Sequence, residues 1–235
     1  TDRELRTMLD DLGLAVADLD CIAPIAGRGD DGEAFYGATE DDVLRAAAGL
    51  GARSVNVVLR HDEHWTIDAA AAEFARVCDR AVADGLLVHI EPVPFMKVKS
   101  VPAGWEIVRL ADRPNGGIQI DAWHHFRGPA RDDDLSSVPG ERILAVQLCD
   151  APAEPDGKAF EEANHRRRVP GEGDLDLTGL LRLLYRDRGC RAPIGVEIFS
   201  DEVDARPPAE VGRIVADATK RVVATALKVQ RKGEG

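Results

Sequence analysis

Short apolar runs alternate with longer amphipathic segments along the chain. Runs rich in β-branched and other apolar residues predict six strands, at 14–23, 54–60, 86–94, 117–124, 143–150 and 193–200. Apolar residues at helical spacing predict helices at 40–50, 67–84, 104–111, 177–187 and 208–230. This alternation is typical of βα units that are wound onto one parallel sheet.

Two segments depart from the alternation. Residues 27–38 are rich in Gly and Asp, and residues 151–176 are polar and contain Pro, Gly and a run of arginines. Long loops inside a compact α/β domain usually serve function, and in a βα barrel the active site forms at the carboxyl ends of the strands. We therefore expect both loops to lie at that end and to set specificity.

Composition narrows the class of protein. A chain of 235 residues with 44% hydrophobic content can build one core, so a single domain over 1–235 is expected. The net charge of −12 disfavours nucleic acid as a partner, because it repels a phosphate backbone. The four cysteines form no CxxC pair, which favours reduced, buried thiols. With no leader and no apolar run of ~20 residues, we expect a cytoplasmic protein without a membrane partner.

Polar side chains occur near the carboxyl ends of four predicted strands: Glu91, Asp121, Gln147 and Glu197. Singly, each carboxylate has an ordinary alternative role, as a helix cap or as the partner of an arginine. Together in one barrel mouth, three carboxylates would repel one another unless a cation neutralised them. The pattern predicts one divalent metal ion. Oxygen donors favour Mg²⁺ or Mn²⁺, and cobalt, nickel or zinc are less favoured occupants.

Five motifs carry a resemblance to a known family. They are His-Ile-Glu-Pro at 89–92, Asp-Ala-Trp-His at 121–124, Val-Gln-Leu-Cys-Asp at 146–150, Arg-Arg-Val-Pro-Gly-Glu-Gly-Asp at 167–174 and Gly-Val-Glu-Ile-Phe at 195–199. Together they resemble the xylose isomerase-like TIM barrels, the sugar phosphate isomerase/epimerase superfamily, over about half of the chain.

The resemblance implies a fold and a ligand set. It implies a (β/α) barrel in which the positions of Glu91, Asp121, Gln147 and Glu197 bind the metal. Many members have histidine at position 147, and glutamine is similar to the hydroxypyruvate isomerase and 3-dehydroshikimate dehydratase branches. Family barrels have eight strands, and the first visible strand here aligns best with the third. About two N-terminal βα units are therefore expected to be missing from this sequence.

The resemblance also implies an activity. We expect a divalent-metal-dependent isomerase or epimerase of a small sugar, sugar phosphate or cyclitol, which works through a metal-stabilised enediolate, with Glu91 and Glu197 as proton donor and acceptor. The main alternative is a dehydratase that resembles 3-dehydroshikimate or inosose dehydratase. An endonuclease IV-like enzyme is disfavoured by the charge and by too few suitable histidines. A non-catalytic sugar-binding barrel is disfavoured because buried ligand oxygens without a metal would destabilise the fold.

Several further residues are candidates for binding the small polyhydroxylated carbonyl substrate. The resemblance implies that His124 contacts the substrate, as the matching histidine commonly does in the family. A family arginine that often faces the substrate matches either Arg167 or Arg168. For either arginine, a solvated charge on the loop is an equal alternative. Arg60 and His64 follow a predicted strand end, and His89 is expected beneath the metal. Oligomeric state stays open. Members often form dimers or tetramers, and the predicted helix 208–230 offers a surface for a homo-oligomer.

Overall fold

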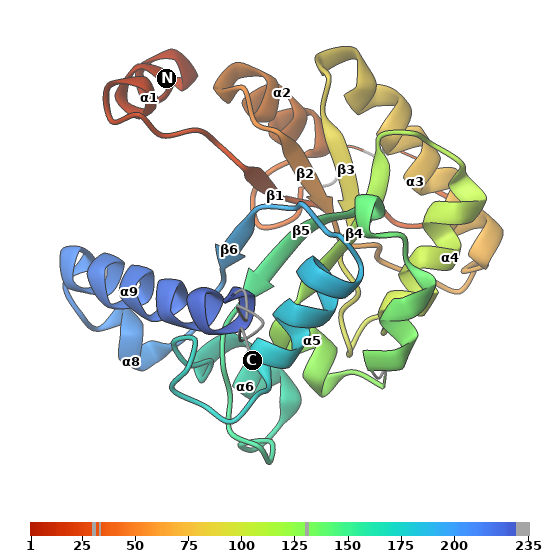
Figure 1. The fold of residues 1–235 in the computed structure, drawn as a ribbon. Coiled ribbons are helices and arrows are strands. Elements are labelled where there is room, and N and C mark those ends of the chain that lie inside the picture. Colours follow the sequence, from red (N-terminus) through yellow and green to blue (C-terminus); the bar gives the residue numbers. More distant parts are fainter. Residues whose placement is uncertain (30–31, 33, 130–131, 229–235) are drawn as a thin grey trace, which may run out of the picture.

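The six predicted strands form one parallel sheet. The computed structural model describes residues 1–29, 32, 34–129 and 132–228, and in it each strand pairs with the next along the chain, from β1 to β6 (Figure 1). The strands are β1 (Asp18–Ile22), β2 (Ser54–Val57), β3 (Leu87–Ile90), β4 (Gly116–Asp121), β5 (Ile143–Leu148) and β6 (Ile194–Val196).

Helices follow the strands and lie around the outside of the sheet (Figure 1). The α-helices are α1 (Asp2–Asp11), α2 (Glu40–Leu50), α3 (Ile67–Ala81), α4 (Val101–Ala111), α5 (Ala122–Arg127), α6 (Ala159–His165), α7 (Leu177–Leu181), α8 (Asp201–Asp204) and α9 (Pro208–Leu227). Short 3₁₀ turns lie at Val82–Asp84, Asp132–Ser137 and Gly140–Arg142, and α7 continues as a π-helical turn over Arg182–Asp187. No helix of the described residues combines the length and the apolar character that a membrane span requires.

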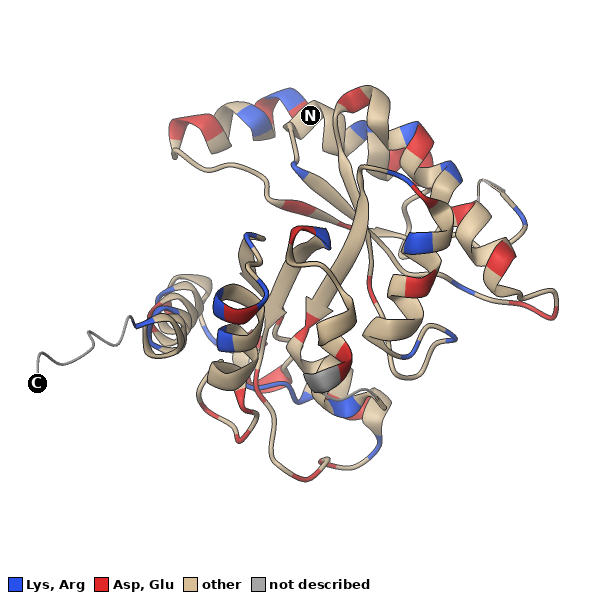
Figure 2. Cartoon of the chain, turned by 45° about the vertical axis from the view of Figure 1, so that its right-hand side comes forward, with Lys and Arg blue, Asp and Glu red and all other residues tan. Residues whose placement is uncertain are grey.

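The two faces of each strand differ in chemistry. Val55 and Val57 of β2 point outward and pack in the core with Phe74 of α3, whereas Asn56 between them points to the inner face of the sheet. The same alternation holds in β3 and β4. Apolar positions therefore bury the sheet against the helices, and polar positions collect on the inner face. Figure 2 accordingly shows most charged residues on helices and loops, with most of the strand length uncharged.

Local signals in the sequence explain where helices begin and end. Thr39 caps α2 with a capping box, because its hydroxyl accepts from the Asp42 N–H while the Asp42 carboxylate accepts from the Thr39 N–H. Gly51 ends that helix at a φ of 63°, in the left-handed region that glycine adopts without strain. The predicted boundaries of this helix, 40–50, are therefore confirmed.

Other boundaries correct the sequence prediction. The strand predicted at 117–124 ends at Asp121, because the Asp121 side chain accepts a hydrogen bond of 2.7 Å from the His124 N–H and caps α5. The predicted loop 151–176 contains α6, a helix too short and polar to give a periodic signal. Helix α1 was likewise not predicted. It has no buried residue and exposes Leu5 and Met8, and Leu12 directly after it is exposed as well.

Gly117 of β4 lies in close contact with the main chain next to β5, which leaves no room for a side chain. A Cβ atom added there would lie 2.5 Å from the Arg142 carbonyl oxygen and from Leu144 Cγ, whereas at Gly195 in β6 the nearest atom would be 3.9 Å away. We predict that Gly117→Ala lowers the free energy of unfolding by about 1–3 kcal/mol or more, because the clash involves main chain. Gly195→Ala is the matched control and should be neutral or slightly stabilising. Urea denaturation followed by circular dichroism measures both, and equal stability of the two variants would contradict this close packing at Gly117.

Candidate metal centre

Four side chains converge where three strands end. Each of Glu91, Asp121, His124 and Glu197 offers a donor atom, and these four atoms lie within 4.8 Å of one another. Glu91 directly follows β3, Asp121 ends β4, and Glu197 directly follows β6. The carboxyl ends of neighbouring parallel strands meet at the same edge, so residues far apart in the chain come together there. The predicted positions of the three carboxylates are thus brought together.

Burial and mutual repulsion raise the pKa values of two carboxyl groups in the cluster. Burial, with the nearby charges of Glu197, Asp20 and Asp121, raises the pKa of Glu91 well above its ordinary value. Burial and Asp121 raise the pKa of Glu197 to about 7, against the opposing effect of Arg167. Burial lowers the pKa of His124 to about 4, so its imidazole is neutral near pH 7 and keeps a lone pair for a metal.

The donor set fits a divalent cation. Among the described residues, the buried Oε1 of Glu91 has no hydrogen-bond partner, and its neighbour at 3.5 Å is Nε2 of His124. Three carboxylates and one neutral imidazole supply charge and lone pairs that a cation would satisfy. Because the cluster includes a nitrogen donor, zinc, cobalt and nickel fit it as well as Mg²⁺ and Mn²⁺.

Gln147 lies beside this cluster. It is paired with Asp121 across β4 and β5, and its Oε1 accepts a hydrogen bond of 2.5 Å from Nε2 of Gln119. Its own Nε2 faces Oε1 of Glu197 at 3.5 Å. To bind the metal, Gln147 would have to turn its amide oxygen toward a cation held by the carboxylates. Its role as a ligand therefore stays a prediction.

One of the two candidate arginines enters the site. Nη1 of Arg167 lies 2.8 Å from Oε2 of Glu197 and 3.1 Å from Oδ2 of Asp121, and its guanidinium stacks over Trp123 and Phe199. Its side chain is only 3% exposed, so the contacts with carboxylates compensate a buried charge.

Arg168 does not reach the donor cluster, so of the two arginines Arg167 is the one that the fold brings to the site. Arg168 is exposed, and its Nη1 contacts the carbonyl oxygen of Glu172 at 3.4 Å. The segment is extended, because Arg168 forms an antiparallel bridge with Asp150. Successive side chains of extended backbone point to opposite sides, so Arg167 faces inward and Arg168 faces outward.

Three further candidates lie outside the donor cluster. The His64 side chain is 77% exposed, and its Nε2 lies 3.6 Å from the Glu63 carboxylate. Arg60 donates from Nε to the carbonyl oxygen of Ala23 and lies over the ring of Phe35. His89 is fully buried on the inner face of the sheet, where Nε2 contacts Asp18 at 3.0 Å. None of the three lines the cavity above the donor cluster. His89 lies in β3 two residues before Glu91, so its expected place beneath the metal stays a prediction.

A cavity of about 460 Å³ opens above the cluster. Its polar lining includes Glu91, Glu197, His124, Arg167 and Asp20. Its remaining wall is largely aromatic, with Phe35, Tyr36, Phe95, Phe160 and Phe199. The predicted loop 27–38 contributes Phe35 and Tyr36, and the predicted loop 151–176 contributes Phe160. Asp20 was missed by the sequence prediction. The available signal was the two-residue spacing of Asp18 and Asp20 in the predicted strand 14–23.

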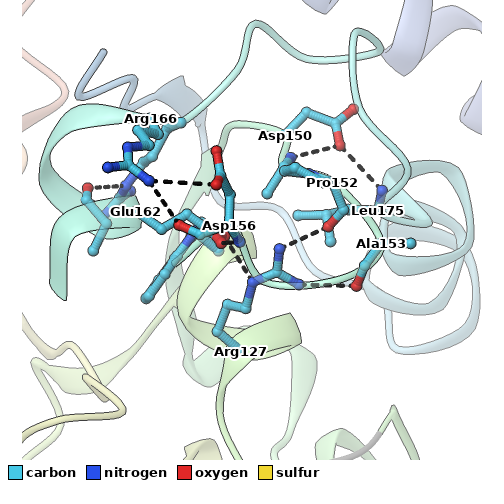
Figure 3. Close-up of polar contacts among 12 residues, drawn as sticks. Arg127, Asp150, Pro152, Ala153, Asp156, Glu162, Arg166 and Leu175 are labelled. Atoms are coloured by element: carbon cyan, nitrogen blue, oxygen red, sulfur yellow. Dashed lines mark hydrogen bonds and ion pairs between the residues drawn. The ribbon is translucent and has the colours of Figure 1, made fainter. Parts of the chain in front are cut away.

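Buried polar contacts hold the 151–176 loop at the cavity (Figure 3). Glu162 of α6 is fully buried and accepts hydrogen bonds from Trp123 Nε1 at 2.9 Å, from Arg127 Nε at 2.7 Å and from the Asp156 N–H at 2.5 Å. In Figure 3, Arg127 lies between Glu162 and the carbonyl oxygen of Pro152, to which Nη2 donates at 2.6 Å.

At the other end of the loop, Asp150 accepts backbone hydrogen bonds from Ala151, Gly171 and Leu175. The loop is therefore fixed at both ends. Its middle part, α6, carries Phe160, Ala163 and Asn164 to the cavity wall.

Glu162 should be the most sensitive residue of this loop. We predict that Glu162→Ala lowers the free energy of unfolding by about 3–5 kcal/mol, because Arg127 would keep a buried charge without its partner. The neighbouring Glu161 is exposed, so Glu161→Ala should change it by at most about 0.5 kcal/mol. Chemical denaturation of both variants checks the difference, and similar values would show that the Glu162 contacts do not stabilise the loop.

The fold and the family model agree on the class of protein. The chain belongs to the xylose isomerase-like TIM barrel family, whose model matches residues 1–221. Among solved structures, the IolI protein with a bound zinc atom superposes with a TM-score of 0.77 at 19% identity, over 96% of this chain and 83% of that one. The predicted family and barrel fold are confirmed.

Relatives with an assigned activity are enzymes. The chain is 31% identical over 138 residues to a 3-dehydroshikimate dehydratase of Pseudomonas aeruginosa. The matched segment covers 58% of this chain and 22% of that protein. The chain is also 26% identical over 141 residues to an inosose isomerase of Halalkalibacterium halodurans. This second matched segment covers 59% of this chain and 49% of the isomerase. The matches thus span about a fifth of the dehydratase and half of the isomerase. By sequence, the chain is thus similar to part of a dehydratase and to part of an isomerase.

Proposed function

We propose that this chain forms the active site of a metal-dependent isomerase or epimerase that removes a proton from the carbon beside a carbonyl group in a small polyhydroxylated compound. The observation that carries the proposal is the cluster of three carboxylates and one imidazole at the floor of the cavity. A volume of about 460 Å³ suits a small molecule. The aromatic wall suits the apolar face of a sugar or cyclitol ring.

The chemistry divides between the ion and the protein. A bound divalent cation would withdraw electrons from a substrate carbonyl oxygen and so acidify the adjacent C–H. Glu91 and Glu197 both line the cavity, and one would accept the proton while the other returns it. Return to the neighbouring carbon gives an isomer, and return to the opposite face of the same carbon gives an epimer. Arg167 holds Glu197 through Oε2, which orients the carboxylate for this role.

The donor set bears on the identity of the metal. The carboxylates favour Mn²⁺ or Mg²⁺, and the imidazole of His124 adds affinity for zinc, cobalt or nickel. Zinc is further supported by the structural relative that was solved with that ion. We propose Mn²⁺ or Zn²⁺ as the first ions to test.

A second candidate function is dehydration. It is favoured by the 31% identity to a 3-dehydroshikimate dehydratase and by the glutamine at position 147. Here the same proton removal would precede loss of a hydroxyl group from the next carbon, with a protonated carboxyl group giving its proton to the departing oxygen. Isomerisation, epimerisation and dehydration therefore share the proton removal and differ only in the second step.

Metal binding is the first prediction of this proposal. The full chain should bind Mn²⁺ at one ion per chain in isothermal titration calorimetry. Loss of a residue that only orients a metal ligand weakens metal binding by about 10–100-fold. Glu197→Gln removes a ligand itself, so it should weaken binding by at least about 100-fold. Glu106→Gln removes an exposed carboxylate of α4 and should bind as the unmodified chain does. No binding by the unmodified chain would refute the proposed function.

The reaction outcome is the second prediction. The Mn²⁺-loaded chain would be incubated in deuterated water with inosose and, separately, with 3-dehydroshikimate. An isomerase or epimerase incorporates deuterium into the compound without loss of water, which mass spectrometry and NMR detect. A dehydratase releases water and forms a conjugated product that absorbs in the ultraviolet. Glu197→Gln should abolish either reaction, and a metal-loaded chain with neither activity on a broader panel of ketoses would indicate a binding protein instead.

A further inference from the structure

A buried asparagine, Asn56, lies between two carboxylates on the inner face of the sheet. It occupies the middle of β2 and is fully buried. Its Nδ2 is 2.7 Å from Oδ1 of Asp20 and 2.7 Å from Oε2 of Glu91. A side-chain amide nitrogen has two hydrogens, so one N–H is donated to each carboxylate. Both donors of Asn56 are therefore engaged.

The contact fixes one oxygen of Glu91 and leaves the other free. With Oε2 held by Asn56, the direction of Oε1 is determined, and this second oxygen of Glu91 is buried and has no hydrogen-bond partner among the described residues. It lies 3.5 Å from Nε2 of His124, within the donor cluster.

The other two carboxylates of the cluster also accept hydrogen bonds from the protein. Asp121 accepts from the His124 N–H through Oδ1 and from Arg167 through Oδ2, and Glu197 accepts from Arg167 through Oε2. Each carboxylate thus has at least one donor, which restricts its rotation. For Glu91 that donor is Asn56.

Asp20 in turn restrains Asn56. The register between β1 and β2 shifts between Leu19, which pairs with Val55, and Ile22, which pairs with Val57, so β1 carries one extra residue there. At this irregularity Asp20 reaches both the cavity and the amide of Asn56. An amide turned the other way would point its oxygen at two carboxylates, so the observed orientation is the favourable one when these are ionised.

The geometry points to Asn56 as a positioning residue that presents Oε1 of Glu91 to the metal, with Asp20 fixing the amide. This role rests on the proposed function, because it requires that the cluster bind a cation. Asn56 does not line the cavity, and its amide N–H groups are donated to Asp20 and Glu91, so its effect on the metal passes through Glu91.

The test compares two buried asparagines. Asn56→Leu keeps the size of the side chain and removes both N–H donors, and it should weaken Mn²⁺ binding to the full chain by about 10–100-fold in calorimetry. Asn115 precedes β4, at the end of the sheet away from the cluster, and its Nδ2 donates to the carbonyl oxygens of Cys78 and Leu86 at 3.0 and 3.1 Å. Asn115→Leu loses as many buried hydrogen bonds, and should lower the melting temperature of the metal-free chain while leaving the Mn²⁺ dissociation constant within about twofold.

A second variant guards against misfolding. Threonine is favoured in strands, and its hydroxyl is too short to reach both carboxylates, so Asn56→Thr should fold and also weaken Mn²⁺ binding by about 10-fold or more. Circular dichroism confirms the fold of each variant. Unchanged Mn²⁺ affinity in a folded Asn56 variant, or an equal loss in Asn115→Leu, would overturn the positioning role while the metal site itself stands. Absence of binding in the unmodified chain would instead refute the proposed function.

Discussion

Repulsion among buried carboxylates is the constraint around which this fold is organised. Donor atoms of Glu91, Asp121 and Glu197 come within 4.8 Å of one another, and the first two side chains are buried while that of Glu197 is partly buried. Such an arrangement persists only if each negative charge has a donor or a cation beside it. The donors are Asn56 of β2, the first turn of α5, and Arg167 of the 151–176 loop. The site therefore depends on the relative placement of elements from most of the sequence.

The strand-end pattern was enough to predict the carboxylates. In a parallel sheet the strands share direction and the side chains alternate, so polar residues at the ends of Leu87–Ile90 and Gly116–Asp121 must meet at one edge. The rule works because it uses only strand direction and the two-residue period, both of which can be read from a single sequence.

Contacts that depend on three-dimensional register could not be read in this way. Asn56 and Asp20 are polar residues in strands without a motif, and their relation to Glu91 arises from strand pairing and a register shift. Arg167 and Arg168 are identical in type, and only the bridge to Asp150 decides which one faces inward. His64 follows a strand end as the residues of the donor cluster do, yet its side chain is exposed. Helix α6 was missed because its role comes from one buried glutamate rather than from an apolar stripe.

The position of Arg167 limits how this protein can diversify. In many barrels, specificity changes when an exposed loop is exchanged and the catalytic floor stays as it was. Here the loop that supplies Phe160 to the cavity wall also supplies Arg167, whose guanidinium group contacts Asp121 and Glu197. Replacing that segment with one from another family member would alter substrate recognition and the electrostatics of the floor together. The segment and the floor are therefore expected to have evolved as one unit, and a chimera would have to carry its arginine along with its aromatic residues.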